Sequence, residues 1–352
     1  MDVILTPLWL ISRSVTLHRH GRQTNTYRDV ARDVYSTLQA DTGRLSSMDS
    51  RSSLILGLAL VGIVACRDRS DTRADSRGAS LPPVYPSGPL ENTHWNADAG
   101  PLMILSIGNG GNTSWVLLPE ATDSTIASFE AINPPITGLN FDLFGRGGRA
   151  AASVRAYALP PVDSSADCYA WPRARIDKPV DNWRVGFVSG RTASIRLDSI
   201  EVRPSRDSAA LAVAVVQTAA TLPVGTDPTF RGLPFRVRSA YSFRLDSVDV
   251  VIADVIRTVN EEANPRVEHI FLIAERATGS TGKYTAGYYS RTAGSEDSVP
   301  VTDLLAVLEI GPTRRPAAVV SIEYEDGNTV GFVERTGAGQ WTATWKSAYT
   351  DC

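Results

Sequence analysis

The sequence has few of the residues that most often build metal and nucleophilic sites. Its 352 residues include four histidines and three cysteines, and only His94 and His269 lie beyond residue 66. A histidine-rich zinc site is therefore not expected. The chain also lacks a GxSxG, HExxH, Walker or CxxC motif in a supporting context. We expect neither a metal nor a cofactor, and the balance leans away from an enzyme.

Positive charge is not in excess either. The formal net charge is -3, and only Lys178, Lys283 and Lys346 among the 35 basic residues are lysines. A nucleic-acid surface needs clustered positive charge, so a nucleic-acid partner is not expected. In contrast, 43% of the residues are hydrophobic. A chain of this length and composition can fill a large globular core.

The sequence also lacks a long apolar run. Its clearest apolar run is short. Residues 54–66 read LILGLALVGIVAC, with Arg51 before them and Arg67 directly after. A helix that spans a membrane needs roughly 20 apolar residues. The run is shorter and fits the apolar region of a secretory signal.

The end of this run, Ile63-Val64-Ala65-Cys66, resembles the lipobox of bacterial lipoproteins. Small residues precede an invariant cysteine in that family. The resemblance implies that Cys66 takes a diacylglycerol on its thiol, that the signal is cleaved before it, and that the new amino terminus is acylated, for example with palmitate. It also implies a place in the cell envelope, at the periplasmic or surface face of a bacterial membrane. A buried core helix is the alternative.

The resemblance divides the chain into four parts. Met48 opens a complete lipoprotein signal over 48–65, so residues 1–47 are predicted to be a mis-called upstream extension. Residues 66–100 carry the anchor and then a stretch rich in Ser, Asp, Arg, Gly and Pro. Such a stretch buries too little surface to offset its ordering entropy and is predicted to be a disordered tether. Residues 101–352 form the exported domain, with a possible sub-boundary near 160–165.

The exported domain is predicted to be β-rich α+β with mainly antiparallel strands. Residues 102–107 and 114–118 flank GNGGN, a strong hairpin signal. Further strands are expected at 150–159, paired with 183–188, and at 193–197. Eight more follow, linked by short turns that favour antiparallel neighbours. They are expected at 235–245, 248–259, 267–276, 284–291, 304–310, 317–324, 329–334 and 340–346.

One helix is expected, over residues 206–221, where RDSAALAVAVVQTAAT is apolar nearly all round and precedes Pro223. That pattern predicts a helix buried against a sheet. The overall architecture stays open between a sandwich, a strongly curved sheet and a partial propeller.

Residues 304–345 resemble a degenerate blade of the integrin-type, FG-GAP-like repeats of exported β-propellers. That repeat carries an Asp-rich, calcium-binding loop between its first two strands, and here the loop reads GPTRRP. The resemblance therefore does not imply a calcium site in this chain. The stretch 230–276 resembles a block found in bacterial lipoproteins and implies no activity.

Candidate catalytic residues gather around the turn at Pro265. Glu261, Glu262 and Glu268, with His269, could serve glycoside hydrolysis or bind a hard cation. The alternative, which we favour, is a solvated hairpin loop whose acids pair with Arg257 and Arg266.

Two other groups are candidates for binding. Arg146 and Arg149 in GRGGR could hold an anion, although a basic β-turn is favoured. Trp341 and Trp345 are four apart on one expected strand and would share a face, which could bind a glycan together with Trp171 and Trp183. A place in the core is the favoured alternative.

The two remaining cysteines, Cys168 and Cys352, are predicted to form a disulfide. If Cys66 carries lipid, an even remainder is left in an oxidising compartment. The bridge would tie the end of the chain to the earlier part of the domain.

The expected function is that of a membrane-anchored, non-enzymatic lipoprotein that binds an envelope protein or glycan. The alternative is a periplasmic hydrolase acting on envelope glycans.

The anchor can be tested with Cys66→Ser. Serine cannot form the thioether, so we expect the protein to stay as an uncleaved precursor without lipid. Metabolic labelling with a fatty acid measures lipid attachment, and the gel mobility of the product measures cleavage of the signal. Normal processing and membrane partitioning of the variant would show that the apolar run is not a lipoprotein signal.

Overall fold

Six strands close into a barrel in the computed structural model, which describes residues 94–108, 110–119, 136–160, 170–260 and 264–351. All of these belong to one compact unit, Gly78–Cys352. The barrel order is β1-β2-β5-β4-β3-β6. The strands are β1 Met103–Ser106, β2 Gly110–Leu117, β3 Asn140–Gly145, β4 Gly148–Ala158, β5 Arg173–Asp181 and β6 Val185–Val188. Short 3-10 turns occur at Ala97–Ala99, Ile200–Val202 and Pro228–Phe230.

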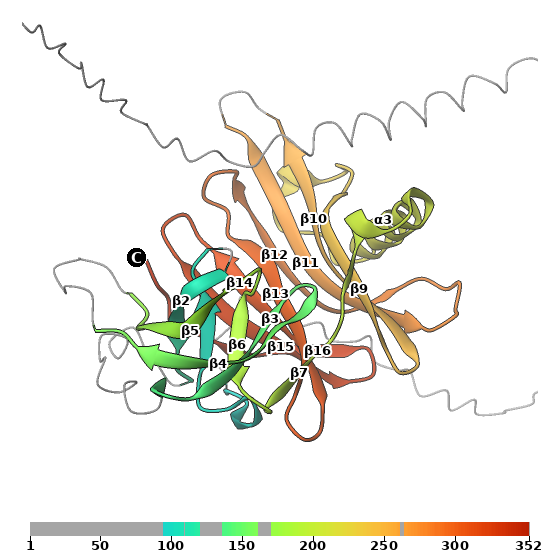
Figure 1. Cartoon of the computed structure of the whole chain (residues 1–352). Helices are drawn as coiled ribbons and strands as arrows, with labels where there is room; N and C mark the ends of the chain where they lie inside the picture. Colours follow the sequence, from blue (N-terminus) through green and yellow to red (C-terminus); the bar gives the residue numbers. More distant parts are fainter. Residues whose placement is uncertain (1–93, 109, 120–135, 161–169, 261–263, 352) are drawn as a thin grey trace, which may run out of the picture. The chain divides into compact units, whose positions relative to one another are not determined.

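The rest of the chain forms two five-stranded antiparallel sheets (Figure 1). The central sheet has the order β16-β15-β14-β13-β7, and the outer sheet has the order β12-β11-β10-β9-β8. The central strands are β7 Thr192–Ser194, β13 Val301–Ile310, β14 Arg315–Glu323, β15 Asn328–Gly337 and β16 Gln340–Lys346. The outer strands are β8 Asp198–Ser199, β9 Arg236–Leu245, β10 Val248–Val259, β11 Arg266–Ala277 and β12 Thr285–Ser295.

The β-rich, mainly antiparallel fold class is therefore confirmed, and all eight strands expected after residue 234 are present. Strands β13 to β16 form the expected meander over 304–345 and continue the pairing to β7. A meander of this kind occurs in many sheets, so it does not test the propeller resemblance.

Both faces of each sheet are covered, which explains the uninterrupted apolar runs in the sequence. In β14, Ala317 and Val319 pack toward the barrel, and Ala318 and Val320 pack toward the outer sheet. Strands buried on both faces read as continuous hydrophobic segments instead of alternating ones. The layers follow in the order barrel, central sheet, outer sheet and helix.

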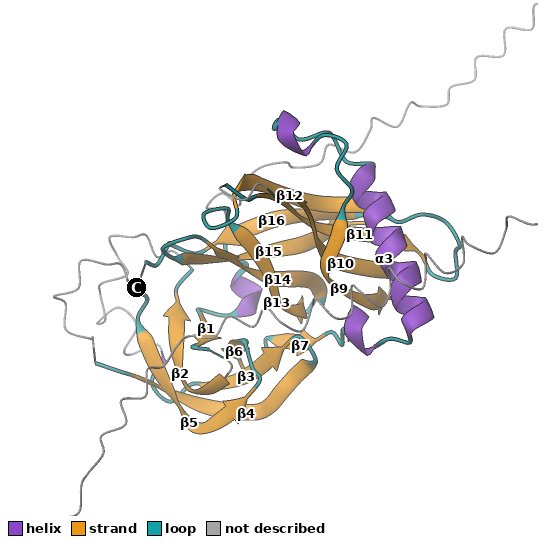
Figure 2. Ribbon diagram, turned by 90° about the horizontal axis from the view of Figure 1, so that it is seen from above, coloured by secondary structure: helices purple, strands orange, loops and turns teal. Residues whose placement is uncertain are grey.

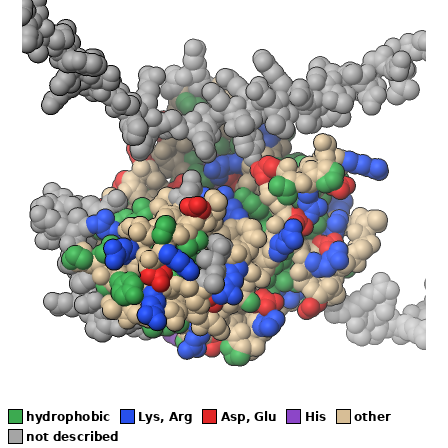
Figure 3. Space-filling view, viewed as in Figure 1, with side chains coloured by type: hydrophobic (Ala, Val, Ile, Leu, Met, Phe, Trp, Pro, Cys, Tyr) green, Lys and Arg blue, Asp and Glu red, His purple; other side chains and the backbone are tan. Residues whose placement is uncertain are grey.

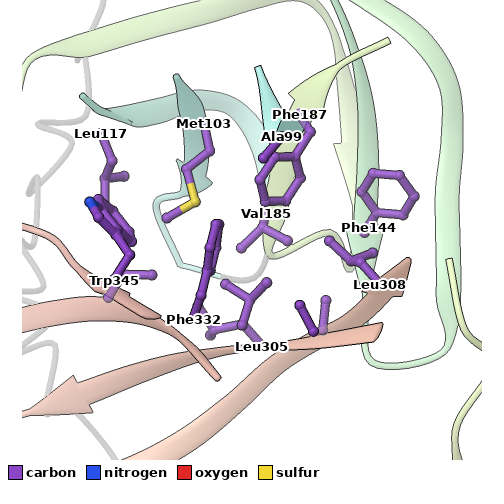
Figure 4. Close-up of a cluster of buried hydrophobic side chains, with 14 of the residues drawn as sticks. Ala99, Met103, Leu117, Phe144, Val185, Phe187, Leu305, Leu308, Phe332 and Trp345 are labelled. Atoms are coloured by element: carbon purple, nitrogen blue, oxygen red, sulfur yellow. The ribbon is translucent and has the colours of Figure 1, made fainter. Parts of the chain in front are cut away.

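The core between the barrel and the central sheet is rich in aromatic rings (Figure 4). Met103 and Phe187 of the barrel face Phe332 and Trp345 of the central sheet. The rings of Phe187 and Phe332 lie 5.9 Å apart between centroids, and those of Phe332 and Trp345 lie 5.3 Å apart. These separations fall in the favourable range for aromatic pairs.

The helix α3, Ser205–Ala220, packs on the free face of the outer sheet (Figure 2). It buries Leu211, Val215 and Ala219 against that sheet. The expected helix is present and packs against a sheet, as predicted, but its apolar pattern extends beyond the face that is buried. Val213 is 56% exposed because only one face of α3 meets a partner in the described structure.

The barrel differs from the expectation in its pairing. Residues 150–159 do not pair with 183–188, because β4 pairs with β3 and β5, whereas β6 pairs with β1 and β3. Closure of the barrel places β6 between its first and third strands, and nothing in the local sequence encodes that partner choice. The region near 160–165 lies between two paired barrel strands, and the barrel gives way to the sheets only after β6.

The folded part begins before residue 101. The Trp95 ring lies 4.7 Å from the Trp345 ring between centroids, and its Nε1 donates to the Gly100 carbonyl at 2.7 Å. Ala99 is fully buried in the same core. The last residues assigned to the tether therefore pack on the central sheet.

Gly186→Ala tests the packing inside the barrel. A Cβ on Gly186 would lie 2.7 Å from Ile104 Cγ1 and 2.8 Å from Leu143 Cδ2. Overpacking of this kind costs about 1–3 kcal/mol, so we expect the free energy of unfolding to fall by that amount. Gly147→Ala is the control, because a Cβ there meets nothing within 4 Å. Equal denaturant midpoints for the two variants would contradict a filled barrel.

Candidate functional site

Glu268 lies inside the outer sheet, fully buried, and forms a bidentate ion pair. Arg257 is its direct neighbour on β10 and donates from Nε to Oε2 at 2.5 Å and from Nη2 to Oε1 at 3.1 Å. Pairing with Arg257 agrees with the favoured interpretation, but the expected solvated loop is wrong for Glu268. Strand β11 begins at Arg266, so Glu268 already belongs to the sheet. Glu261 and Glu262 lie outside the described residues.

His269 points to the opposite face of β11 from Glu268. Its Nδ1 lies 3.2 Å from Asp254 Oδ2, and Asp254 also accepts from Arg238 at 2.7 Å. Successive strand residues face opposite sides of a sheet, so Glu268 and His269 cannot act on one substrate.

Arg266 does not pair with the described acid of this cluster, Glu268. It donates from Nη2 to Asp227 Oδ2 at 2.6 Å, which ties β11 to the loop before β9. Pairing of Glu268 with Arg257 is therefore confirmed, and pairing of Arg266 with Glu261 or Glu262 stays a prediction, because those two acids lie outside the described residues.

Arg146 and Arg149 flank a tight turn between β3 and β4, in which Gly145 pairs with Gly148. Arg146 donates to the Leu304 carbonyl at 2.6 Å and pairs with Asp303. Arg149 donates to Asp142 at 2.5 Å. Because protein oxygens occupy both guanidiniums, the geometry favours the basic turn over an anion site.

Trp341 and Trp345 do not share a face, contrary to the expectation. Trp341 pairs with Arg335 and Trp345 with Phe332, and the register shifts by one residue at Thr344. This bulge turns Trp341 toward the outer sheet and Trp345 toward the barrel.

All four candidate tryptophans are core residues. Trp341 and Trp345 are each 1% exposed, Trp171 is 3% exposed, and Trp183 is fully buried. No glycan can stack on these rings in the folded chain. The structure therefore agrees with the favoured prediction that these tryptophans belong to the core. Cys66, Cys168 and Cys352 lie outside the described residues.

Glu275 joins the two sheets, and no sequence signal singled it out. Arg335 donates to it from Nε at 2.7 Å and from Nη2 at 2.9 Å, the Trp341 indole donates at 2.7 Å, and the Gly339 amide at 3.0 Å. Burial raises the pKa of Glu275, but these donors outweigh burial and hold the pKa below its usual 4.5. This group is structural, because every oxygen is occupied.

A groove of about 490 Å³ opens between α3 and the outer sheet, and we call it the α3 groove. Its wall on the helix side combines Asp207 with small and apolar side chains, and its sheet side carries charged groups. It is lined by Asp198, Arg203, Asp207, Ala210, Leu211, Ala214, Ser242, Phe243, Arg244, Asp249, Arg276 and Tyr284.

Two guanidiniums in the α3 groove have unused donors. Arg203 donates from Nη2 to the Ser242 hydroxyl, and its Nε is buried with no hydrogen-bond partner among the described residues. The Nε of Arg276 is also buried without a hydrogen bond, although it lies 3.5 Å from Asp249 Oδ2. Each guanidinium also faces a carboxylate, since Arg203 Nη2 lies 3.8 Å from Asp198 Oδ2 and Arg276 Nη2 donates to Asp249 Oδ2 at 3.5 Å. Buried donors normally have partners, so the two Nε atoms are the unsatisfied donors of the groove within the described residues.

Tyr284 completes the polar side of the groove. Its ring lies under the Arg276 guanidinium, 4.5 Å from centroid to Cζ, and burial raises the pKa of its hydroxyl. The stacking fixes the plane of the guanidinium. Arg203, Arg276 and Tyr284 come from separate segments in ordinary polar contexts, so no local motif announces the site.

Charges of both signs are interspersed on the face of the molecule in Figure 3, without a large area of one sign. Among the described residues, no group of three or more His, Cys, Asp or Glu side chains could hold a metal ion. No helix in that part of the chain is both long and apolar enough to cross a membrane. No protein-family model, curated protein or solved structure matches the chain.

Glu275→Gln tests the junction of the sheets. A carboxylate with depressed pKa contributes stability that is present above pH 4.5 and is lost as the pH falls toward its folded pKa. We expect the substitution to lower the free energy of unfolding at pH 7 by about 2–3 kcal/mol. The deficit should shrink below pH 4.5. Denaturant unfolding at several pH values measures this.

Glu325→Gln is the control for this series, because Glu325 is exposed. A deficit in Glu275→Gln that stays constant as the pH falls would contradict the account of Glu275.

Proposed function

We propose that the chain is an exported lipoprotein, held at a bacterial envelope membrane by lipid on Cys66, whose folded part binds an anionic envelope component in the α3 groove. The lipobox resemblance over residues 63–66 supports the address. The groove supports the binding activity.

The observation that carries the proposal is the pair of unused donors on Arg203 and Arg276. Leaving a buried donor unsatisfied costs about 1–3 kcal/mol. Each of the two side chains is also about one third exposed, at 30% for Arg203 and 31% for Arg276. A carboxylate or phosphate offers acceptor oxygens that match guanidinium geometry, so an oxyanion in the groove could accept from their outer Nη atoms. Ala210, Leu211 and Ala214 of α3 line the groove beside them, and apolar surroundings strengthen electrostatic attraction.

Binding is favoured over glycan hydrolysis by the state of Glu268. A general acid or nucleophile must reach its substrate, whereas both oxygens of Glu268 are held by Arg257 inside the sheet. The tryptophans that could have stacked on a sugar are buried.

Arg276→Gln tests the proposal by equilibrium dialysis of radiolabelled acetate and inorganic phosphate. The lipidated chain is held in nanodiscs of neutral lipid, and empty nanodiscs are subtracted. Loss of a charge-assisted hydrogen bond costs about 1.5–3 kcal/mol, so we expect at least about tenfold weaker binding. Arg203→Gln should behave alike.

Arg231→Gln is the matched control, because Arg231 is exposed and lies outside the lining of the groove. Thermal unfolding checks that each variant folds. Wild-type binding by both groove variants, or no anion binding by the wild-type chain, would refute the proposal.

A further inference from the structure

We draw no further inference here: the strongest candidate, the hollow of about 410 Å³ that four arginines line between the β9–β10 and β13–β14 turns, has no unsatisfied buried donor among its described residues, and each of its arginines already pairs with a carboxylate, so nothing in the structure shows what would occupy it.

Discussion

Burial of both sheets on both faces is the constraint on which this structure depends. Strands such as β10 place Val250 and Ile252 toward the central sheet and Val251 and Ala253 toward the helix. Each sheet therefore needs a cover on either side, and the barrel, the two sheets and α3 supply them in turn. The series ends at α3, whose outer face has no described cover. The α3 groove lies along this last layer.

Polar groups hold the layers in register. Glu275 of the outer sheet accepts hydrogen bonds from Arg335 and Trp341 of the central sheet and from Gly339 in the turn between their strands. The carboxylate is stable there because its hydrogen bonds and its ion pair compensate for burial. Glu268 uses the same principle on the other face of the outer sheet. Glu268, a catalytic candidate in the sequence, thus serves the fold.

The sequence predicted the positions of the strands and the helix better than it predicted which strands pair. Strong β-prone runs with turn residues between them located the last eight strands and α3. Strands β3 and β5 were missed, and the pairing of β6 was wrong, because barrel closure depends on contacts between distant residues. The bulge at Thr344 separated Trp341 from Trp345, and a period-two pattern cannot reveal such an insertion. The groove could not be predicted, since Arg203 and Arg276 become neighbours of one hollow only after folding.

A structure of the chain determined with inorganic phosphate bound tests the proposed anion site most directly. The account predicts phosphate oxygens within about 3 Å of the exposed Nη atoms of Arg203 and Arg276. Phosphate bound elsewhere, or a groove that stays empty at saturating phosphate, would contradict it.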